Sequence, residues 1–227
     1  STVTKEIAYH LLHRNQTVGV IALEESVRES IRSILGIAIS KKLNDEDVRK
    51  EIKPKDIQKA YDDFNTRLYF YDHFGSLNGN DILANIRYLA VACKCKYIIL
   101  DHITIVLSGL DGDDRKNLDV TVTKLRSLCQ ELNIAIIMVS HLKRLEGNRD
   151  HVDGVQISLG HLRGSGSIAH LSNLCIGLER NQQGDNPNEM LVRILKNRFN
   201  GKTGLVDTLH YDDETGRILN RTQLSDF

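Results

Sequence analysis

The sequence predicts an α/β fold with a central, mainly parallel sheet flanked by helices. Apolar residues recur first at helical spacing and then in short continuous runs, and the two patterns alternate along the chain. The apolar runs lack polar alternation, as do strands that are covered on both faces. Strands that alternate with helices form βαβ units, so this order predicts a parallel sheet.

Helical spacing opens the chain. Val3, Ile7 and Leu11 recur every four residues and predict a helix over residues 2–14. The first half then contains these further predicted elements: a buried strand over 17–23, a helix from Glu24 to about Ser40, charged helical segments over 44–66 with Pro54 near a helix start, and a short strand over 67–71.

The second half continues the alternation and ends in strands. The pattern predicts a turn at 78–80, helices over 81–93, 116–132 and 166–171, buried strands over 97–100 and 134–139, a polar loop over 143–162, and strand-like runs over 173–179, 190–197 and 204–210. No internal repeat and no linker interrupts this order, so we expect residues 1–227 to form one domain.

The composition is that of a soluble globular protein. The 227 residues include 41% hydrophobic and 26% charged residues, which argues against disorder. Lys and Arg together number 30, as do Asp and Glu, so binding of nucleic acid requires a local basic patch. No apolar run approaches the ~18 residues of a membrane span, and residues 1–6 lack a signal-peptide pattern. We therefore expect a cytoplasmic protein with no membrane partner.

Four cysteines lie at positions 93, 95, 129 and 175. A single residue separates Cys93 from Cys95, whereas zinc knuckles place two or more residues between their thiols. We interpret all four as reduced thiols that pack as small apolar side chains, which agrees with an intracellular compartment. The sequence predicts no zinc site.

Three ionisable residues directly follow apolar strands: Glu24, Asp101 and His141. Functional groups of parallel sheets gather at the carboxyl ends of the strands. Asp101 suits a carboxylate that orients water on Mg²⁺, and Glu24 suits one that polarises an attacking water. His141 suits a sensor of a γ-phosphate. Taken singly, each has an alternative: a turn or cap aspartate, an acid at a capped helix start, and a structural histidine.

Glycines and cations add candidate phosphate contacts. Gly164 and Gly166 flank Ser165, and such backbone permits close approach to a phosphate, although it also suits a surface turn. Lys196 and Arg198 stand two residues apart near a strand end, so they face the same side. They suit either pairing with local acids or contact with a phosphate bound elsewhere.

The motifs together resemble a known family. The chain contains, in order, LEES at 23–26, IILDHI at 98–103, SHLK at 140–143, LRGSG at 162–166, LERNQQGD at 178–185 and RILKNRF at 193–199. This combination resembles the helicase domain of the bifunctional primase–helicases of short-tailed bacteriophages, within the DnaB-like hexameric helicases, of which the mitochondrial helicase Twinkle is a more distant relative. The resemblance covers nearly the whole chain, and the LRGSG and LERNQQGD stretches are its most specific parts.

The resemblance implies a RecA-like P-loop NTPase core, whose subunits form a ring around one DNA strand and bind nucleotide between neighbours. It assigns Ser1 to the hydroxyl group that ligates Mg²⁺, with Thr2 after it in the nucleotide site. It assigns Asp101 to the Walker B carboxylate, which acts on Mg²⁺ through water. Glu24 resembles the catalytic glutamate, and His141 resembles the γ-phosphate sensor.

The resemblance also implies roles toward the nucleotide of the neighbouring subunit and toward the nucleotide's base. Arg198 resembles the arginine finger that is supplied across the interface, with Lys196 beside it in the nucleotide site. Such arginines contribute ~10³–10⁵ in rate. Arg180 and Tyr211 resemble the pair that packs around the base, which suits their planar groups. An exposed strand-end tyrosine is the alternative for Tyr211.

The loop after His141 resembles the DNA-binding loop that lines the central channel. The candidate DNA contacts are Lys143, Arg144, Arg149, Arg163, Gly164 and Ser165. The acidic residues at 146, 150 and 153 offset most of this positive charge, so one subunit has only a slight net positive field. In a ring, the fields of six copies of the loop that point into one channel would add. We expect tracking of a single-strand backbone without base-specific readout.

The chain departs from the family pattern at three places. No G-x-x-x-x-G-K-[ST] match occurs, so it lacks the backbone and lysine that hold the β- and γ-phosphates. We expect a longer protein in which the glycine-rich loop, a linker and any primase region precede Ser1. His170 stands where phage relatives usually carry Gln and adds a proton-dependent charge, and Gly147 stands where they often carry Lys.

These features predict a ring-shaped replicative DNA helicase that hydrolyses ATP or dTTP with Mg²⁺, translocates on single-stranded DNA and unwinds duplex. The expected partners are single-stranded DNA, further copies of the chain in a hexamer or heptamer, a replicative DNA polymerase and a primase. The expected location is the cytoplasm of a phage-infected bacterium. Two alternatives stay open: a RecA-like recombinase that coats DNA, and an oligomerisation module without nucleotide activity.

Overall fold

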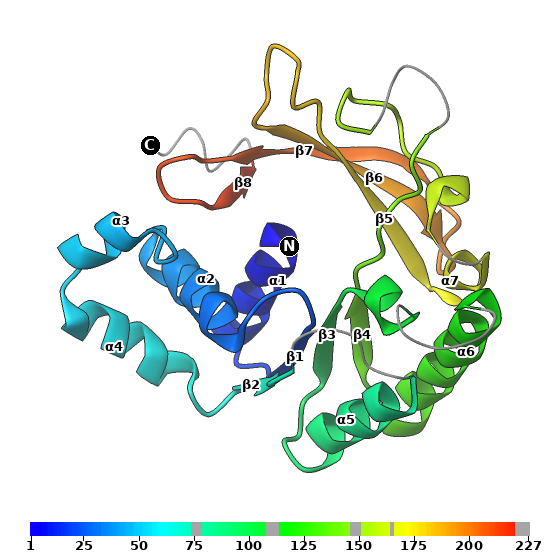
Figure 1. Ribbon diagram of the computed structural model, residues 1–227, viewed down its shortest axis with the longest axis horizontal. Helices are drawn as coiled ribbons and strands as arrows, with labels where there is room; N and C mark the ends of the chain where they lie inside the picture. Colours follow the sequence, from blue (N-terminus) through cyan, green and yellow to red (C-terminus); the bar gives the residue numbers. More distant parts are fainter. Residues whose placement is uncertain (74–78, 108–113, 146–150, 164–165, 221–227) are drawn as a thin grey trace. The chain divides into compact units, whose positions relative to one another are not determined.

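The computed structural model describes residues 1–73, 79–107, 114–145, 151–163 and 166–220 (Figure 1). The chain divides into two compact units, the first with residues 1–140 and 214–217 and the second with residues 141–213 and 218–220. Each unit has its own four-stranded sheet. No helix among the described residues is long and apolar enough to cross a membrane.

The first unit is built on a parallel sheet with strand order β2-β1-β3-β4. Its elements are α1 (Thr2–His13), β1 (Val18–Ala22), α2 (Val27–Ile39), α3 (Glu46–Glu51), α4 (Pro54–Phe64), β2 (Leu68–Tyr71), α5 (Gly79–Val91), β3 (Tyr97–Asp101), the 3₁₀ helix η1 (Ile103–Leu107), α6 (Asp114–Leu132) and β4 (Ala135–Met138). This order confirms the predicted α/β fold with a central parallel sheet and flanking helices.

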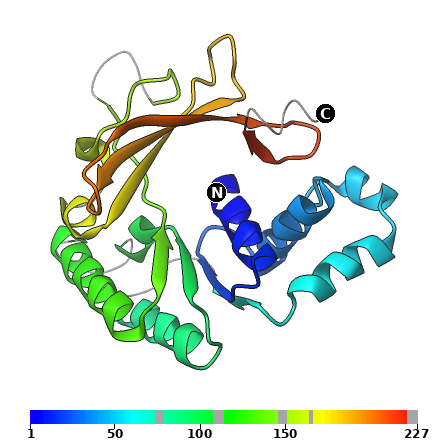
Figure 2. The ribbon, with the colours of Figure 1, turned by 180° about the vertical axis from the view of Figure 1, so that it is seen from behind.

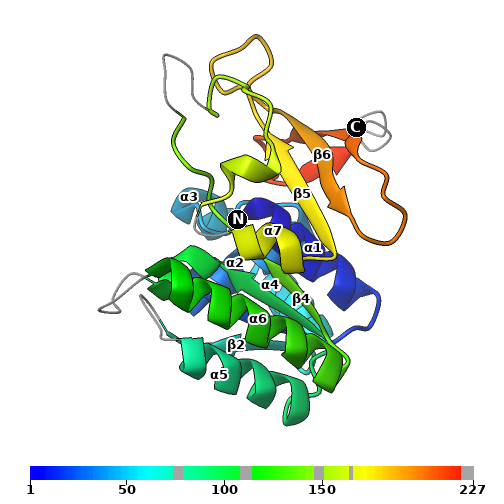
Figure 3. The same cartoon turned by 90° about the vertical axis from the view of Figure 1, so that its right-hand side faces the viewer.

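Alternate residues of β1 face opposite sides of the sheet and pack against different helices. Val18 and Val20 belong to an apolar cluster with buried residues of α1, α2 and α4. Gly19 faces the other way, where an added Cβ would lie 3.1 Å from Leu89 Cδ1 in α5. Helix α6 packs beside α5 (Figure 3). Because helices cover both faces, the strands are continuous apolar runs.

Local sequence rules fix the helix boundaries. Ser26 caps α2, and its side chain accepts a hydrogen bond from the backbone of Glu29. The charged segment predicted over 44–66 divides into α3 and α4, because Pro54 restricts Lys53 to an extended conformation with φ −67° and ψ 129°. Figure 2 shows α4 beside α2, with α3 on the connection between these two helices. Helix α5 begins at Gly79, two residues before its predicted start.

The second unit is built on an antiparallel sheet with strand order β5-β6-β7-β8. Its elements are the 3₁₀ helix η2 (Leu159–His161), α7 (Gly166–Leu171), β5 (Leu174–Glu179), β6 (Glu189–Asn197), β7 (Gly204–Tyr211) and β8 (Ile218–Asn220). The sequence predicts β5 to β7 but not the three-residue β8. Their antiparallel direction follows from connections that are too short for a parallel crossover.

All four cysteines are free thiols. Cys95 is fully buried, and burial raises its pKa to about 12. Burial also raises the pKa of Cys129 and Cys175. These thiols therefore act as apolar packing groups rather than as nucleophiles.

Candidate functional site

Glu24 lies just after strand β1, and Asp101 is the last residue of the neighbouring parallel strand β3. Strands β1 and β3 pair with Ala22 opposite Asp101, and Leu23 donates its backbone N–H to the Asp101 carbonyl oxygen at 2.8 Å. Glu24 comes next in the chain and is exposed. The parallel register therefore brings both residues to the same edge of the sheet, where functional groups of α/β proteins gather.

The start of α1 meets the Asp101 carboxylate. Thr4 Oγ1 lies 3.3 Å from Asp101 Oδ2, and the chain-terminal amino group of Ser1 lies 2.7 Å from the same oxygen. Thr4 also donates to the Ser1 carbonyl oxygen at 2.7 Å, which holds the first turn of α1. Thr2 is the first residue of the helix and is exposed. No sequence motif pointed to Thr4.

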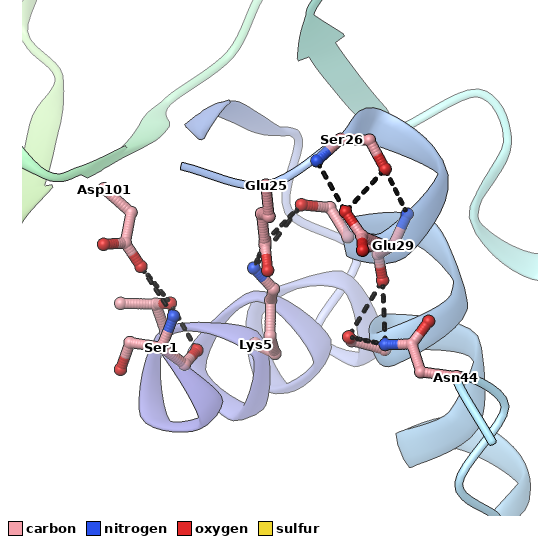
Figure 4. A network of polar contacts seen from close by, with 10 residues as sticks. Ser1, Lys5, Glu25, Ser26, Glu29, Asn44 and Asp101 are labelled. Atoms are coloured by element: carbon pink, nitrogen blue, oxygen red, sulfur yellow. Dashed lines mark hydrogen bonds and ion pairs between the residues drawn. The ribbon is translucent and has the colours of Figure 1, made fainter. Parts of the chain in front are cut away.

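The chemistry at this edge fits a hard divalent cation. Mg²⁺ takes oxygen ligands and usually keeps several waters. Figure 4 shows Ser1 beside Asp101, with the Ser1 nitrogen in contact with the carboxylate. The carboxylate of Asp101 supplies the negative charge that attracts such a cation. A serine hydroxyl group and a carboxylate are oxygen ligands, so Ser1 and Asp101 are the residues that would hold Mg²⁺ here.

A buried lysine connects α1 with the segment after β1 (Figure 4). Lys5 is 4% exposed, and its ammonium group contacts the Glu25 carboxylate. The Ser30 hydroxyl group donates to the same carboxylate oxygen, and Lys5 Nζ lies 3.5 Å from Ser30 Oγ. Burial lowers the pKa of Lys5, and the negative charge of Asp101 opposes that shift. Nothing in the sequence pattern predicted this network.

Ser26 and Glu29 form the capped start of α2 that was the alternative interpretation of Glu24. The Ser26 N–H and hydroxyl groups both donate to Glu29 Oε2, at 2.9 and 2.7 Å. These hydrogen bonds lower the pKa of Glu29. The helix start is therefore capped, but the acid that completes the capping box is Glu29 rather than Glu24.

Glu24 has a histidine neighbour instead. His102 is 4% exposed, and its Nε2 lies 2.8 Å from Glu24 Oε1. The other ring nitrogen, Nδ1, lies 2.6 Å from Thr104 Oγ1 in η1. His102 follows Asp101 directly in the sequence, but sequence reasoning gave it no role, because apolar periodicity does not show which neighbour a strand-end side chain meets.

In the second unit, Lys196 and Arg198 both reach the end of α7. Lys196 Nζ donates to the carbonyl oxygens of Ala169 and His170 at 2.5 and 2.8 Å, and Arg198 Nη2 donates to the His170 carbonyl oxygen at 2.7 Å. Cations at a helix C-terminus satisfy its last carbonyl groups. The two side chains thus face the same side, as their spacing predicts, and their partners here are carbonyl groups rather than local acids.

Arg180 and Tyr211 lie together. The Arg180 guanidinium carbon is 5.7 Å from the centre of the Tyr211 ring, within the range of a cation–π contact. Arg180 also donates to Asn188 Oδ1 at 3.0 Å and to the Pro187 carbonyl oxygen. Arg180 and Tyr211 are both half-buried, so neither is the exposed strand-end side chain of the alternative interpretation.

The two ends of the polar loop pair with each other. Lys143 donates its backbone N–H to the His161 carbonyl oxygen at 2.7 Å, and Arg163 donates to the His141 carbonyl oxygen at 2.9 Å. Lys143 Nζ also donates to the Gly160 carbonyl oxygen at 3.2 Å. His141, Lys143 and Arg163 are therefore held at one place. Arg144 is exposed beside them. The remaining predicted DNA contacts, Arg149, Gly164 and Ser165, lie outside the described residues.

The buried carboxylate of Glu179 holds the backbone near the end of this loop. Glu179 is 5% exposed, and its Oε1 accepts the backbone N–H of Ile157 at 2.9 Å. Arg193 donates to both carboxylate oxygens, at 2.7 and 3.1 Å. Burial alone would raise the pKa of Glu179, but these hydrogen bonds and the charge of Arg193 outweigh it and leave the pKa below its ordinary value. Sequence reasoning included Glu179 only as part of a motif.

Comparison with known proteins agrees with the predicted family. Residues 1–220 match the model of the DnaB-like helicase C-terminal domain. Over 204 residues the chain is 37% identical to a DNA helicase/primase of Enterobacteria phage T3, an alignment that covers 88% of this chain. The alignment covers 36% of that relative, so this chain spans about a third of the phage protein's length.

Solved structures show the same fold. The solved structure of an ATPase domain superposes with a TM-score of 0.79 at 18% identity, covering 96% of this chain and 79% of the other. A DnaB-like replicative helicase superposes with a TM-score of 0.78 at 18% identity, covering 97% and 54%. A KaiC-like protein of Pyrococcus horikoshii gives a TM-score of 0.61 at 15% identity, covering 92% and 77%. The fold is thus the predicted RecA-like core, and the chain belongs to the family of DnaB-like helicase C-terminal domains.

Proposed function

We propose that the chain is the motor domain of a ring-shaped replicative helicase, which hydrolyses nucleoside triphosphate to move along single-stranded DNA and unwind duplex. The observation that carries the proposal is the parallel pairing of β1 and β3, which brings Glu24 and Asp101 to the same carboxyl edge of the sheet. Family membership supports the same reaction class. ATP and dTTP are the substrates to test first.

The first unit supplies the groups for hydrolysis. Ser1 and Asp101 are the residues that would hold Mg²⁺, which would supply neutralisation of phosphate charge. Glu24 is the group that orients the attacking water and accepts its proton. Thr2 lies on the same first turn of α1 and contacts the phosphates. His141 is the residue that we propose as the sensor of the γ-phosphate.

The second unit supplies groups for the neighbour's nucleotide and for the base. We propose Arg198 as an arginine finger acting on the adjacent subunit, with Lys196 beside it. Both side chains here bond carbonyl groups at the end of α7, which holds them side by side without neutralising either charge. Arg180 and Tyr211 form a planar pair suited to packing against a base.

DNA contacts come from the loop that starts at His141. Lys143 and Arg163 are held together by the pairing of the loop's two ends, and Arg144 is exposed beside them. Arg149, Gly164 and Ser165 complete the proposed set. One subunit provides few cations, so a useful field requires several copies around one strand.

The proposed partners are further copies of the chain in a hexamer or heptamer, single-stranded DNA, a primase and a replicative DNA polymerase. The phage relative is a helicase/primase, and one structural neighbour was studied for its interactions with primase. These names support a replisome role, in the cytoplasm of a phage-infected bacterium.

The test is nucleotide hydrolysis by the full-length protein, measured with and without single-stranded DNA. We expect DNA to stimulate hydrolysis strongly, and Arg198→Ala and Glu24→Gln each to abolish most of it. Mixing the two inactive variants should restore part of the activity, because some interfaces then combine an intact Glu24 with an intact Arg198. Lys202→Ala, an exposed cation on the same β6–β7 connection, is the matched control.

Three results would contradict the proposal. Hydrolysis that ignores DNA and survives Arg198→Ala would show that the nucleotide site is not composite. Hydrolysis without unwinding of a forked duplex would favour the DNA-coating recombinase, and no hydrolysis at all would favour an oligomerisation module.

A further inference from the structure

The side chain of Glu24 is half in solvent, but one of its oxygens contacts a buried ring. Its side chain is 52% exposed, whereas that of His102 is only 6% exposed. His102 Nε2 lies 2.8 Å from Glu24 Oε1. A glutamate at the surface ordinarily samples many rotamers. A fixed neighbour at this distance restricts that sampling.

The ring is itself held from its other edge. His102 Nδ1 lies 2.6 Å from Thr104 Oγ1, and His102 follows the last residue of β3. A hydroxyl group that donates to Nδ1 leaves the ring proton on Nε2, the nitrogen that faces the Glu24 carboxylate. The contact with Thr104 therefore restrains the orientation of the ring and is compatible with a proton on Nε2.

We propose that His102 is a positioning residue for Glu24 and that Thr104 orients His102 for this task. The inference rests on the proposed role of Glu24 in hydrolysis and extends it to two residues to which the sequence analysis gave no role. A general base acts only when it lies within hydrogen-bond reach of the water it deprotonates. By holding one carboxylate oxygen, His102 keeps the other directed toward the water.

A purely structural histidine is the competing explanation, because His102 is almost fully buried. The two explanations differ in whether the effect of a His102 variant requires an intact Glu24. A structural role predicts that His102 variants lower stability and nucleotide affinity whether or not Glu24 is intact. A positioning role predicts a loss of turnover that disappears once Glu24 has been replaced.

Four variants test the chain of contacts in the full-length protein: His102→Ala, His102→Gln, Thr104→Val and Thr104→Ser. We expect His102→Ala to lower kcat roughly 10- to 100-fold, the range typical of partners that orient a functional group, with little change in nucleotide Kd. His102→Gln retains an N–H donor and should recover part of the rate. Thr104→Val should lower kcat, whereas Thr104→Ser keeps the hydroxyl group and should stay near wild type.

Two further measurements separate positioning from folding. In a Glu24→Gln background, the His102 and Thr104 variants should cause no additional loss of residual hydrolysis. The ¹⁵N NMR signals of the His102 ring, assigned by comparison with His102→Gln, should show the proton on Nε2 in the nucleotide-free protein. Thr104→Val should alter that tautomer and Thr104→Ser should not.

The outcomes are distinguishable. A wild-type protein that does not hydrolyse nucleotide, or a Glu24→Gln protein that hydrolyses it normally, would contradict the proposed function itself. An active wild type with an inactive Glu24→Gln variant, combined with normal turnover of the His102 and Thr104 variants, would overturn only the positioning role. Losses that add to Glu24→Gln would also overturn it. If His102→Ala does not fold, the Thr104→Val and Thr104→Ser pair decides the question.

Discussion

The ammonium group of Lys5 contacts the carboxylate of Glu25, twenty residues further along the chain, and so connects the first helix to the residue that follows Glu24. The Lys5 side chain is 6% exposed and the Glu25 side chain is 30% exposed. A charged group that loses its partner suffers more when it is buried than when water can reach it. The two partners should therefore differ when they are removed one at a time.

We expect Glu25→Gln to lower the free energy of unfolding by about 3 kcal/mol, because it leaves the buried Lys5 ammonium group without its carboxylate. Lys5→Met should lower it by only about 1 kcal/mol, because the remaining carboxylate is partly hydrated and still accepts from Ser30. Urea unfolding of the two single variants and of the double variant measures the loss of unfolding free energy that each change causes. Equal losses would contradict the asymmetry that the burial of Lys5 predicts. A double variant whose loss is the sum of the two single losses would show that the pair is not coupled.

The Glu179–Arg193 pair should make stability depend on pH. The pKa of Glu179 in the folded protein lies below its ordinary value of 4.5. The ionised form therefore stabilises the folded state fully above about pH 4.5, and this contribution is lost as the pH falls through the folded-state pKa. Glu179→Gln cannot titrate at this position, so it should be less stable than wild type near neutral pH by about 3 kcal/mol.

The measurement is thermal or urea unfolding of wild type and Glu179→Gln across acidic pH. The difference between them should stay constant near neutral pH and shrink as the solution is acidified below pH 4.5. A difference that does not change with pH would mean that the lost packing, rather than the lost charge, accounts for the effect.

The sequence pattern predicted some of the contacts in the candidate site but not others. Glu24 and Asp101 could be placed together because both follow apolar runs, and parallel strands bring their carboxyl ends to one edge. Lys196 and Arg198 could be placed on one side because side chains alternate along a strand. Their shared partner, the His170 carbonyl oxygen, could not be predicted, because it depends on how α7 packs against β6.

The contacts that sequence reasoning missed depend on packing between separate elements. Lys5 reaches Glu25 and Ser30 only because α1 and α2 lie side by side. Its position between Val3 and Ile7 is typical of the solvent side of a helix. The antiparallel direction of the second sheet was not predicted either, since apolar runs identify strands without showing their order or direction.

Tyr211 should affect nucleotide binding more than turnover. If its ring packs on the base beside Arg180, Tyr211→Leu should raise the nucleotide Kd about tenfold, in line with the ~1–3 kcal/mol of an aromatic–base stack, and leave kcat nearly unchanged. Tyr211→Phe keeps the ring and should bind nearly as tightly as wild type. Displacement of a fluorescent nucleotide measures both variants. A Tyr211→Phe variant that binds as weakly as Tyr211→Leu would assign the effect to the hydroxyl group instead of the ring.

Arg144 should contribute to DNA affinity through charge alone. It is exposed in the loop whose ends are joined by the Lys143–His161 and Arg163–His141 backbone hydrogen bonds. Each phosphate contact on a single strand contributes a slope of about −0.7 to the dependence of log affinity on log salt. Arg144→Ala should therefore weaken single-stranded DNA binding equally for different sequences and reduce the slope by about 0.7 for each subunit whose Arg144 contacts a phosphate.

Fluorescence anisotropy over a series of salt concentrations, with two oligonucleotides of different base composition, measures the affinity and the slope together. Lys202→Ala removes an exposed cation from the same unit but outside the loop, so it should leave the slope unchanged. A slope that falls equally for both variants would mean that the protein attracts DNA through its general charge. A loss confined to one oligonucleotide would mean that Arg144 reads a base, which would contradict backbone tracking, because phosphate contacts are the same for every sequence.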